Sequence, residues 1–252
     1  RLETLLNADG TNRYRVRNMG LPGMRVGSGA RYLAHVVKEY RARVVVMYPT
    51  PAHYIGVSRA YCDRALQPLP EGWNSAPMLR LPERFSDLIK ATLPRAIMTQ
   101  LRVWSIDLSM HGQVPLQQVD ETSYQAWEDD LRCAIRSARS SGATLPILVT
   151  HANRFGHMET SEDNYWLVAW RQQYKTLDER AFLGHEKRSN EILARIAAEE
   201  GVPLVDADAV MSGHREYFHD YAHFTDEGSA IIAQLIYQTL AERLEIEDRP
   251  GN

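Results

Sequence analysis

The sequence predicts a parallel α/β sandwich, because short apolar strand segments alternate with longer amphipathic helical segments along the chain. The segment at 43–48 contains four consecutive apolar residues, a run typical of a strand that is buried on both faces of a parallel sheet. Further helix–strand units follow it, and right-handed crossovers between parallel strands place helices on both faces of the sheet. We therefore expect one α/β/α domain over residues 1–252, with a parallel sheet as its middle layer.

The elements are placed in order by hydrophobic periodicity and by helix start signals. In chain order, the predicted elements are a helical turn at 1–7, a strand at 14–18, a helix from Ser28 to Tyr40, a strand at 43–48, a helix at 124–140, a strand at 146–150, a helix at 178–200, a strand at 203–206 and a last helix after Thr225. The Thr225 hydroxyl is a favourable N-cap, and Asp226 and Glu227 follow it in the first turn, where acidic side chains suit the helix dipole.

The composition indicates one ordinary globular domain, since 252 residues with 44% hydrophobic and 24% charged content can bury a sizeable core. The formal net charge of −3 gives no electrostatic reason to expect nucleic acid or an anionic membrane as a partner. Cys62 and Cys133 lie far apart without C-x-x-C spacing, so neither a disulfide framework nor a zinc ribbon is expected. The apolar runs are too short to span a bilayer, and the localisation, whether cytoplasmic, periplasmic or secreted, stays open.

Residues 58–118 form a long, proline-rich insertion between the strand at 43–48 and the next helix. Within it, residues 81–110 contain helical patches that combine large apolar side chains with several basic ones. In one interpretation this segment packs against the side of the domain and leaves its charged face in solvent. In the other it is a lid over the binding pocket, or an interfacial helix that contacts a membrane or an acyl substrate.

The strongest chemical pattern lies at residues 220–228, which read D-Y-A-H-F-T-D-E-G. A carboxylate three residues before an imidazole on a tight turn can accept the ring N–H, which leaves the other ring nitrogen free to deprotonate a hydroxyl. Asp220 and His223 are therefore the predicted acid and base of a hydrolase, the alternative being a surface loop in which Asp220 only caps a turn. No serine lies where the nucleophile is needed, because Ser28 lacks a strand-to-helix elbow and suits a helix N-cap instead.

Other residues suited to a binding pocket follow the predicted strands. Because the carboxyl ends of parallel strands meet at one edge of the sheet, we expect these residues near Asp220 and His223. They are Asn18 and Gly20 after the first strand, Thr50 and His53 after the second, and His151 and Asn153 after the third. Gly20 also has an ordinary interpretation as a turn glycine, and His151 as a hydrogen-bonded loop histidine.

Two of these segments resemble the SGNH, or GDSL-type, hydrolases, a family of flavodoxin-like esterases and acylhydrolases. Residues 18–23, Asn-Met-Gly-Leu-Pro-Gly, are similar to the family's second block, and residues 220–228 are similar to its fifth. The resemblance implies that His223 is the general base, that Asp220 orients it and that the Gly20 N–H donates to the oxyanion. It also implies an ester substrate, such as an acylated glycan, a lipid ester or a small acyl ester, with no cofactor and no metal ion.

The same resemblance implies that the nucleophilic serine and its strand precede Arg1, because residues 1–7 are similar to the end of the helix that follows the nucleophile. The family's strand order, 2-1-3-4-5, places this absent central strand between the strands at 14–18 and 43–48. We therefore expect an N-terminally incomplete domain that needs its missing segment as a partner and is inactive alone.

The third block of the family carries an asparagine that helps to bind the oxyanion, and Ala52, which has no side-chain donor, takes its place here. Thr50 or His53 is a candidate substitute. The change leaves open a second function, that of a non-catalytic module that binds a glycan or a protein partner. Metal-dependent hydrolysis through His219 and His223 is a third, which is disfavoured because a loop is expected where the spacing needs a helix.

Overall fold

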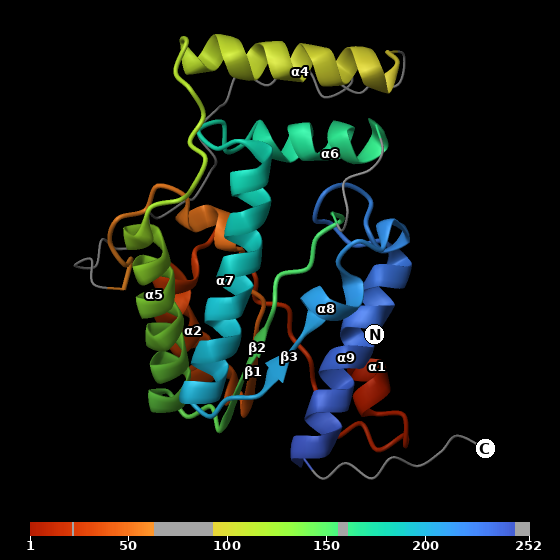
Figure 1. Cartoon of the computed structure of the whole chain (residues 1–252). Coiled ribbons are helices and arrows are strands. Elements are labelled where there is room, and N and C mark those ends of the chain that lie inside the picture. The colour runs from red at the N-terminus through yellow and green to blue at the C-terminus, as the bar shows by residue number, and fades with distance from the viewer. Residues whose placement is uncertain (22, 63–92, 156–160, 245–252) are drawn as a thin grey trace.

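The structure, a computed structural model, describes residues 1–21, 23–62, 93–155 and 161–244. Within these ranges, helices separate three short strands along the chain (Figure 1). In chain order the elements are α1 Leu2–Leu6, α2 Val26–Tyr40, β1 Val44–Met47, the 3₁₀ turn η1 Pro51–Tyr54, α4 Arg95–Met110, α5 Glu121–Ser140, β2 Leu145–Val149, α6 Ser161–Arg171, α7 Glu179–Glu199, β3 Leu204–Val205, α8 Ala207–Met211, the 3₁₀ turn η2 Arg215–Tyr217 and α9 Asp226–Leu244.

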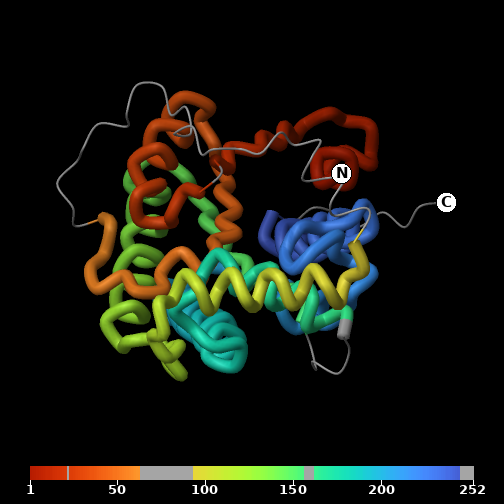
Figure 2. The backbone as a smooth tube through the Cα atoms, turned by 90° about the horizontal axis from the view of Figure 1, so that it is seen from above, coloured from red at the N-terminus to blue at the C-terminus, as the bar shows by residue number. Residues whose placement is uncertain are grey.

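The three strands form one parallel sheet in the order β1-β2-β3, with Val46 opposite Ile147 and Leu148 opposite Leu204. Helices α2, α5 and α7 lie on one side of the sheet, and α1 and α9 lie on the other (Figure 1). The view from above shows the same two groups of helices apart from each other (Figure 2). This arrangement confirms the predicted α/β fold class, and the neighbours predicted for these three strands are the neighbours observed.

The middle strand β2 sends alternate side chains into two apolar cores. Leu148 joins the core beneath α2, α5 and α7, where Trp127 and Phe182 are fully buried. Ile147 and Val149 join the core formed with α1, α8 and α9. Because burying each large apolar side chain contributes about 1.5 to 3 kcal/mol, the two cores together fix β2 and the residues that follow its carboxyl end.

Residues 14–18 are not a strand, which corrects the prediction made for them. Their backbone is bonded to side chains of α1 and of the residue that follows it instead of to β1. The Tyr14 N–H donates to Oδ1 of Asn7 at 2.9 Å, and the Val16 N–H donates to Oε2 of Glu3 at 2.7 Å. The apolar-basic alternation of this segment therefore reflects an exposed, extended connection that is fastened to α1.

β1 pairs with a strand on one side only within the described residues. The Arg43 carbonyl accepts hydrogen bonds from the chain entering β2, so the alternation of a parallel strand points the peptide groups of Val44 and Val46 to the opposite edge. Val45 and Met47 are buried in the core beneath α2, α5 and α7, and Val44 and Val46 are half-buried against the core of α1, α8 and α9. β1 therefore contacts an apolar core on each face, as predicted, and the second face is less completely covered. The open edge presents peptide donors and acceptors that a further strand can pair.

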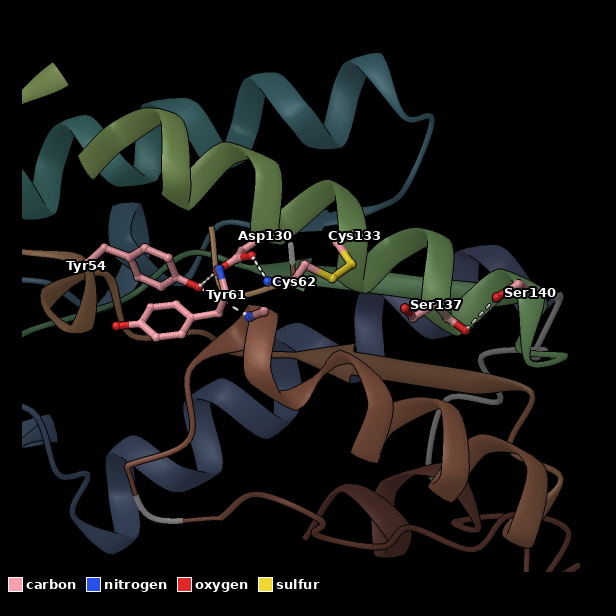
Figure 3. Close-up of a disulfide and its surroundings, with 8 residues drawn as sticks. Tyr54, Tyr61, Cys62, Asp130, Cys133, Ser137 and Ser140 are labelled. Atoms are coloured by element: carbon pink, nitrogen blue, oxygen red, sulfur yellow. Dashed lines mark hydrogen bonds between the residues drawn. A yellow bond between two sulfur atoms is a disulfide. The ribbon is translucent and has the colours of Figure 1, made fainter. Parts of the chain in front are cut away.

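The two cysteines form a disulfide between Cys62 and Cys133, whose Cα atoms are 6.5 Å apart (Figure 3). The expectation that the chain has no disulfide framework is corrected by this bridge, because two cysteines far apart in the sequence are close together in the fold. Asp130 lies one turn before Cys133 on α5 and accepts the Cys62 N–H at 2.9 Å, which holds the two cysteines together. For a sequence separation of 71 residues, the loss of chain entropy in the unfolded state stabilises the fold by about 4 kcal/mol.

Asp130 is a fully buried carboxylate that fastens η1 and the following chain to α5 (Figure 3). Its Oδ2 accepts the Tyr54 hydroxyl at 2.6 Å and the Tyr61 N–H at 3.0 Å, while Oδ1 accepts the Cys62 N–H. Gly27, in the first turn of α2, lies against the same carboxylate, and a Cβ there would be 2.1 Å from Cγ of Asp130. A glycine at this position therefore lets α2 begin in contact with α5.

α4 lies apart from the sheet and packs on α6 (Figure 1). Ile106 and Met110 of α4 form a small apolar cluster with Val168 of α6. The helix predicted within 81–110 is confirmed for α4, and the rest of that prediction, residues 81–92, lies outside the described residues. No helix in the described part of the chain combines the length and apolar character needed to cross a bilayer.

Candidate acid–base site

The residues predicted as acid and base lie in the loop between η2 and α9. An isolated bridge joins Phe218 to Phe224, and the His219 N–H donates to the His223 carbonyl at 2.8 Å, so the loop closes into a tight turn. The stretch is a loop and not a helix, as the sequence predicts. At its end the Thr225 hydroxyl oxygen accepts the Gly228 N–H at 3.1 Å, which is the predicted N-cap of α9.

Asp220 and His223 are hydrogen-bonded to each other, with Nδ1 of His223 2.7 Å from Oδ2 of Asp220. The other carboxylate oxygen, Oδ1, accepts the backbone N–H groups of Ala222 and His223, each at 2.9 Å, so the carboxylate is held in place. When Nδ1–H donates to the carboxylate, Nε2 is the nitrogen that accepts a proton from a hydroxyl. The turn therefore gives the imidazole the tautomer of a general base.

The two side chains differ in exposure, with 25% of Asp220 and 77% of His223 accessible to solvent. Burial alone would raise the pKa of Asp220, but the hydrogen bonds from Ala222 and His223 outweigh it and hold that pKa below its ordinary value of 3.8. The carboxylate is thus ionised at neutral pH and can stabilise an imidazolium. The arrangement suits a base that receives a proton from the solvent side of the loop.

Gly228, the last residue of the motif, lies where α9 approaches η2. A Cβ at this position would be 2.2 Å from the Tyr217 carbonyl oxygen, a backbone atom. Thr225 also holds α9 against η2, because its backbone N–H donates to the Tyr217 carbonyl at 2.9 Å and its hydroxyl donates to the Glu216 carbonyl at 2.9 Å. The contact between α9 and η2 closes the loop that carries Asp220 and His223, here called the acid–base loop. This contact requires a glycine at position 228.

We expect Gly228→Ala to destabilise the protein by about 1 to 3 kcal/mol, because an added methyl group in this contact forces the backbone to shift. The measurement is urea unfolding, together with the chemical shifts of the His223 imidazole, which should move with the loop. Gly184→Ala is the matched control, since a Cβ on this helical glycine would have no atom within 4 Å and alanine favours a helix. Equal stability of the two variants would contradict the steric explanation.

The residues predicted after β1 lie in and before η1. Thr50 and His53 are half-buried, and Ala52 is buried between them. Burial lowers the pKa of His53, and the charges of Arg25 and His151 lower it further, so the ring is favoured in its neutral form. Arg25 also holds this turn, because its Nε–H donates to the His53 carbonyl at 3.2 Å.

His151 follows β2 and is paired with a buried carboxylate that the sequence did not single out. Nδ1 of His151 is 2.7 Å from Oε2 of Glu186, and both side chains are almost fully buried. Asn190, one turn later on α7, accepts the backbone N–H of His151 at 2.8 Å, and its side-chain amide donates to the backbone carbonyl of His151 at 3.0 Å. Glu186 and Asn190 lie one turn apart on the same face of α7, and no spacing in the sequence indicates that this face contacts His151.

Aromatic rings lie between this buried pair and the acid–base loop. The Tyr48 ring stacks on His151 at 5.4 Å and lies 5.9 Å from the ring of Phe224, the residue after His223. The Tyr221 ring is 6.3 Å from the His223 ring. Both imidazole–carboxylate pairs therefore lie at the carboxyl edge of the sheet and contact one group of aromatic side chains.

Asn153 supports the local backbone, since its Oδ1 accepts the Phe155 N–H at 2.9 Å. The neighbouring Arg154, which the sequence did not single out, is buried and donates through Nη1 to the Phe218 carbonyl at 3.0 Å. The Arg154 N–H also donates to the Tyr221 carbonyl at 3.1 Å. Arg154 thus joins the end of β2 to the loop that carries Asp220 and His223.

Asn18 and Gly20 lie on the exposed connection before α2. The Gly20 N–H donates to Oδ1 of Asn18 at 3.0 Å, so the predicted oxyanion donor is engaged with a neighbouring side chain. The hydrogen bonds that hold the Asp220 carboxylate and the His223 ring do not include these two residues. The fold therefore brings His223 and Asp220 together but does not bond Gly20 to them.

No hydroxyl group of the described residues is hydrogen-bonded to the His223 ring. Ser28 lies in the first turn of α2, where its hydroxyl donates to the Arg25 carbonyl at 3.0 Å. The N-cap of this helix is Arg25, so the predicted start of the helix at Ser28 was wrong. Within the ranges that the structure describes, no three His, Cys, Asp or Glu side chains are grouped closely enough to hold a metal ion.

No protein-family model matches the chain, and no curated protein matches it. Among solved structures, the chain is similar to LAE5, described as an alpha/beta hydrolase enzyme from the metagenome of Lake Arreo, Spain, with 15% identity and a TM-score of 0.51. The match covers 94% of this chain and 78% of that chain. At this level of identity, the likeness shows a shared α/β fold.

Proposed function

We propose that the chain is the acid–base part of an SGNH-type ester hydrolase, in which His223 is the general base and Asp220 orients it. The observation that carries the proposal is the 2.7 Å hydrogen bond between these two side chains. It lies on a turn whose backbone N–H groups, those of Ala222 and His223, also bond the Asp220 carboxylate. The exposed imidazole is available to a hydroxyl from outside the described residues. The resemblance of residues 220–228 to the family's fifth block supports the same roles.

In the proposed reaction, Nε2 of His223 takes the proton of a serine hydroxyl as the serine oxygen attacks the ester carbonyl. Asp220 stabilises the imidazolium through Nδ1–H. The C–O bond to the alcohol then breaks, and His223 returns the proton to the leaving alcohol. Water, deprotonated by the same imidazole, then attacks the acyl carbon, and His223 returns this proton to the serine oxygen as the carboxylic acid leaves. Every step uses residues of this chain except the nucleophile itself.

We place the nucleophile on a strand that pairs with the open edge of β1. This placement is supported by the outward-pointing peptide groups of Val44 and Val46, which have no strand partner among the described residues. A parallel strand at that edge would end near Tyr48 and Thr50, on the same side of the sheet as the acid–base loop. Such a strand would supply the segment that the family resemblance places before Arg1.

The oxyanion site is the least complete part of the proposed machinery. The Gly20 N–H would have to exchange its Asn18 acceptor for the substrate oxygen, and Ala52 offers no side-chain donor. His53 is a suitable replacement, because its lowered pKa favours a neutral ring whose N–H can donate. We therefore assign His53, and not Ala52, as the side-chain donor of the proposed oxyanion site.

A fluorophosphonate probe tests this function, because an activated serine oxygen displaces fluoride from phosphorus and stays covalently labelled. The full-length protein encoded by the gene should be labelled at one serine outside residues 1–252, and His223→Ala should abolish labelling. His214→Ala is the matched control, since His214 is an exposed histidine whose Nδ1 also lies near a carboxylate, 3.1 Å from Oε1 of Glu216. Labelling that persists in His223→Ala would overturn the assignment of the base.

A non-catalytic module that binds a glycan or a protein partner is the second candidate. It is favoured by one specific observation, the Gly20 N–H that is already bonded to Asn18. A folded full-length protein that neither hydrolyses p-nitrophenyl acetate nor reacts with the probe, but binds an acylated glycan, would select this function over the first.

A further inference from the structure

α4 carries a stripe of large apolar side chains on the face that points away from the protein. The stripe consists of Ile97, Leu101, Trp104 and Leu108, and each of these residues is between 46% and 64% exposed. Their spacing of four, three and four residues aligns them along one face of the helix. Figure 1 shows α4 at the margin of the molecule, with α6 on one side of it. The stripe is about 16 Å long at 1.5 Å per residue.

The opposite face of α4 is apolar as well and is already covered. Ile106 is fully buried and Met110 is buried, and both pack with Val168 of α6. A helix that is apolar on two opposite faces is usually covered on both. Single exposed leucines are ordinary on a protein surface, but a continuous stripe that includes a tryptophan marks a contact surface.

The charges of α4 argue against an anionic membrane as the occupant of the stripe. Arg95 is bonded to Glu162 of α6 at 2.9 Å, and Arg102 lies over the ring of Tyr165 at 4.4 Å, so both cations are engaged on the α6 side. The exposed charge of α4 nearest the stripe is Asp107. Helices that lie on anionic membranes carry lysines or arginines beside their apolar face, and this face has an acidic residue instead.

We propose that the stripe is the contact surface for a second copy of the chain, with the two α4 helices antiparallel about a two-fold axis. Ile97 of each copy then faces Leu108 of the other, and Leu101 faces Trp104. The axis passes between residues 102 and 103, so the two Asp107 carboxylates lie roughly 14 Å apart along the helices. In the antiparallel pair the positive end of each helix dipole lies beside the negative end of the other, which favours this arrangement over a parallel one.

The area of the stripe predicts a weak dimer. The four side chains expose roughly 400 to 500 Å² per copy, so the pair would bury close to the ~1,000 Å² at which specific interfaces begin. We therefore expect a dissociation constant of about 10⁻⁵ M, in the range of transient interfaces. Trp104, as the large aromatic side chain at the centre, should contribute most of the binding energy.

The experiment is light scattering coupled to size-exclusion chromatography on the oxidised chain, from about 1 µM to about 200 µM. The mass should rise from that of the 28.8 kDa chain towards twice that value. Trp104→Ser should raise the dissociation constant at least about tenfold, because central aromatic residues commonly contribute most of the binding energy of an interface. Val210→Ser is the control, because Val210 is an exposed apolar residue on α8, outside the stripe.

Cysteine cross-linking tests the orientation with a short bismaleimide, which leaves the native disulfide intact. In the antiparallel pair the two Leu101→Cys thiols are offset by only about 4.5 Å along the axis and should be joined, whereas two Leu108→Cys thiols are offset by about 16 Å and should not. Joining at both positions would overturn the antiparallel geometry.

Three results would overturn the proposal as a whole. They are a monomer at all concentrations, an unchanged dimer in Trp104→Ser, and Trp104-dependent binding of phosphatidylcholine–phosphatidylglycerol vesicles by a monomer. None of these results depends on hydrolase activity.

Discussion

Replacing His223 with alanine should lower kcat/KM for p-nitrophenyl acetate by about a thousandfold or more in the full-length protein, because the serine loses its proton acceptor. Asp220→Asn should lower it by about 10³- to 10⁴-fold, since an amide in place of the carboxylate can hold the ring in the wrong tautomer and cannot stabilise the imidazolium. The double variant should be no worse than His223→Ala alone, because the two residues act as a unit.

The pH dependence of kcat/KM tests the ionisation state of Asp220. The hydrogen bonds to Asp220 lower its pKa below 3.8, so its carboxylate is ionised throughout the range above that value. Protonation of Asp220 should therefore not lower kcat/KM until the pH approaches that value. His214→Ala should leave both the rate and the profile unchanged, because His214 is an exposed histidine outside the site. Full activity in Asp220→Asn would contradict the orienting role.

Asp130→Ala should destabilise the protein by about 3 to 5 kcal/mol. The Tyr54 hydroxyl and the N–H groups of Tyr61 and Cys62 would lose their acceptor, and each buried donor left unpaired costs about 1 to 3 kcal/mol. The alanine would also leave a cavity beside Gly27, where the carboxylate now fills the space. The loss should therefore exceed that of a typical substitution several-fold.

Urea unfolding of the oxidised protein measures this loss. Asp130→Asn should fall between alanine and the wild type, because the amide keeps one oxygen acceptor and the shape of the side chain. Asp107→Ala, on the exposed face of α4, should change the unfolding free energy by less than about 0.5 kcal/mol. A loss below about 1 kcal/mol in Asp130→Ala would show that solvent replaces the three hydrogen bonds and that the carboxylate does not fasten these elements.

The features that the sequence predicts well are those formed by residues close together in the chain. Asp220 reaches His223 within one turn, and Thr225 caps α9 within three residues, so each geometry follows from local backbone rules. The core face of β2 follows from an apolar run for the same reason. In each case the interacting atoms are fixed by a spacing that can be counted in the sequence.

The features that the sequence does not predict depend on distant partners. Residues 14–18 have a strand-like pattern, but the side chains of Glu3 and Asn7 take their backbone hydrogen bonds. Glu186 has the pattern of an ordinary helix residue, and only the fold sets it against His151, 35 residues earlier. Tertiary contacts override local preference at these positions, and a single sequence carries no spacing rule for them.

The disulfide between Cys62 and Cys133 makes the segment between them a closed covalent ring. A protease that cuts one peptide bond within residues 63–132 would therefore yield a molecule whose two pieces stay together until a reductant is added. On a denaturing gel such a nicked chain would migrate as one species without reductant and as two with it. A binding or regulatory role for this segment could thus be studied after cleavage, with both halves of the α/β core still joined.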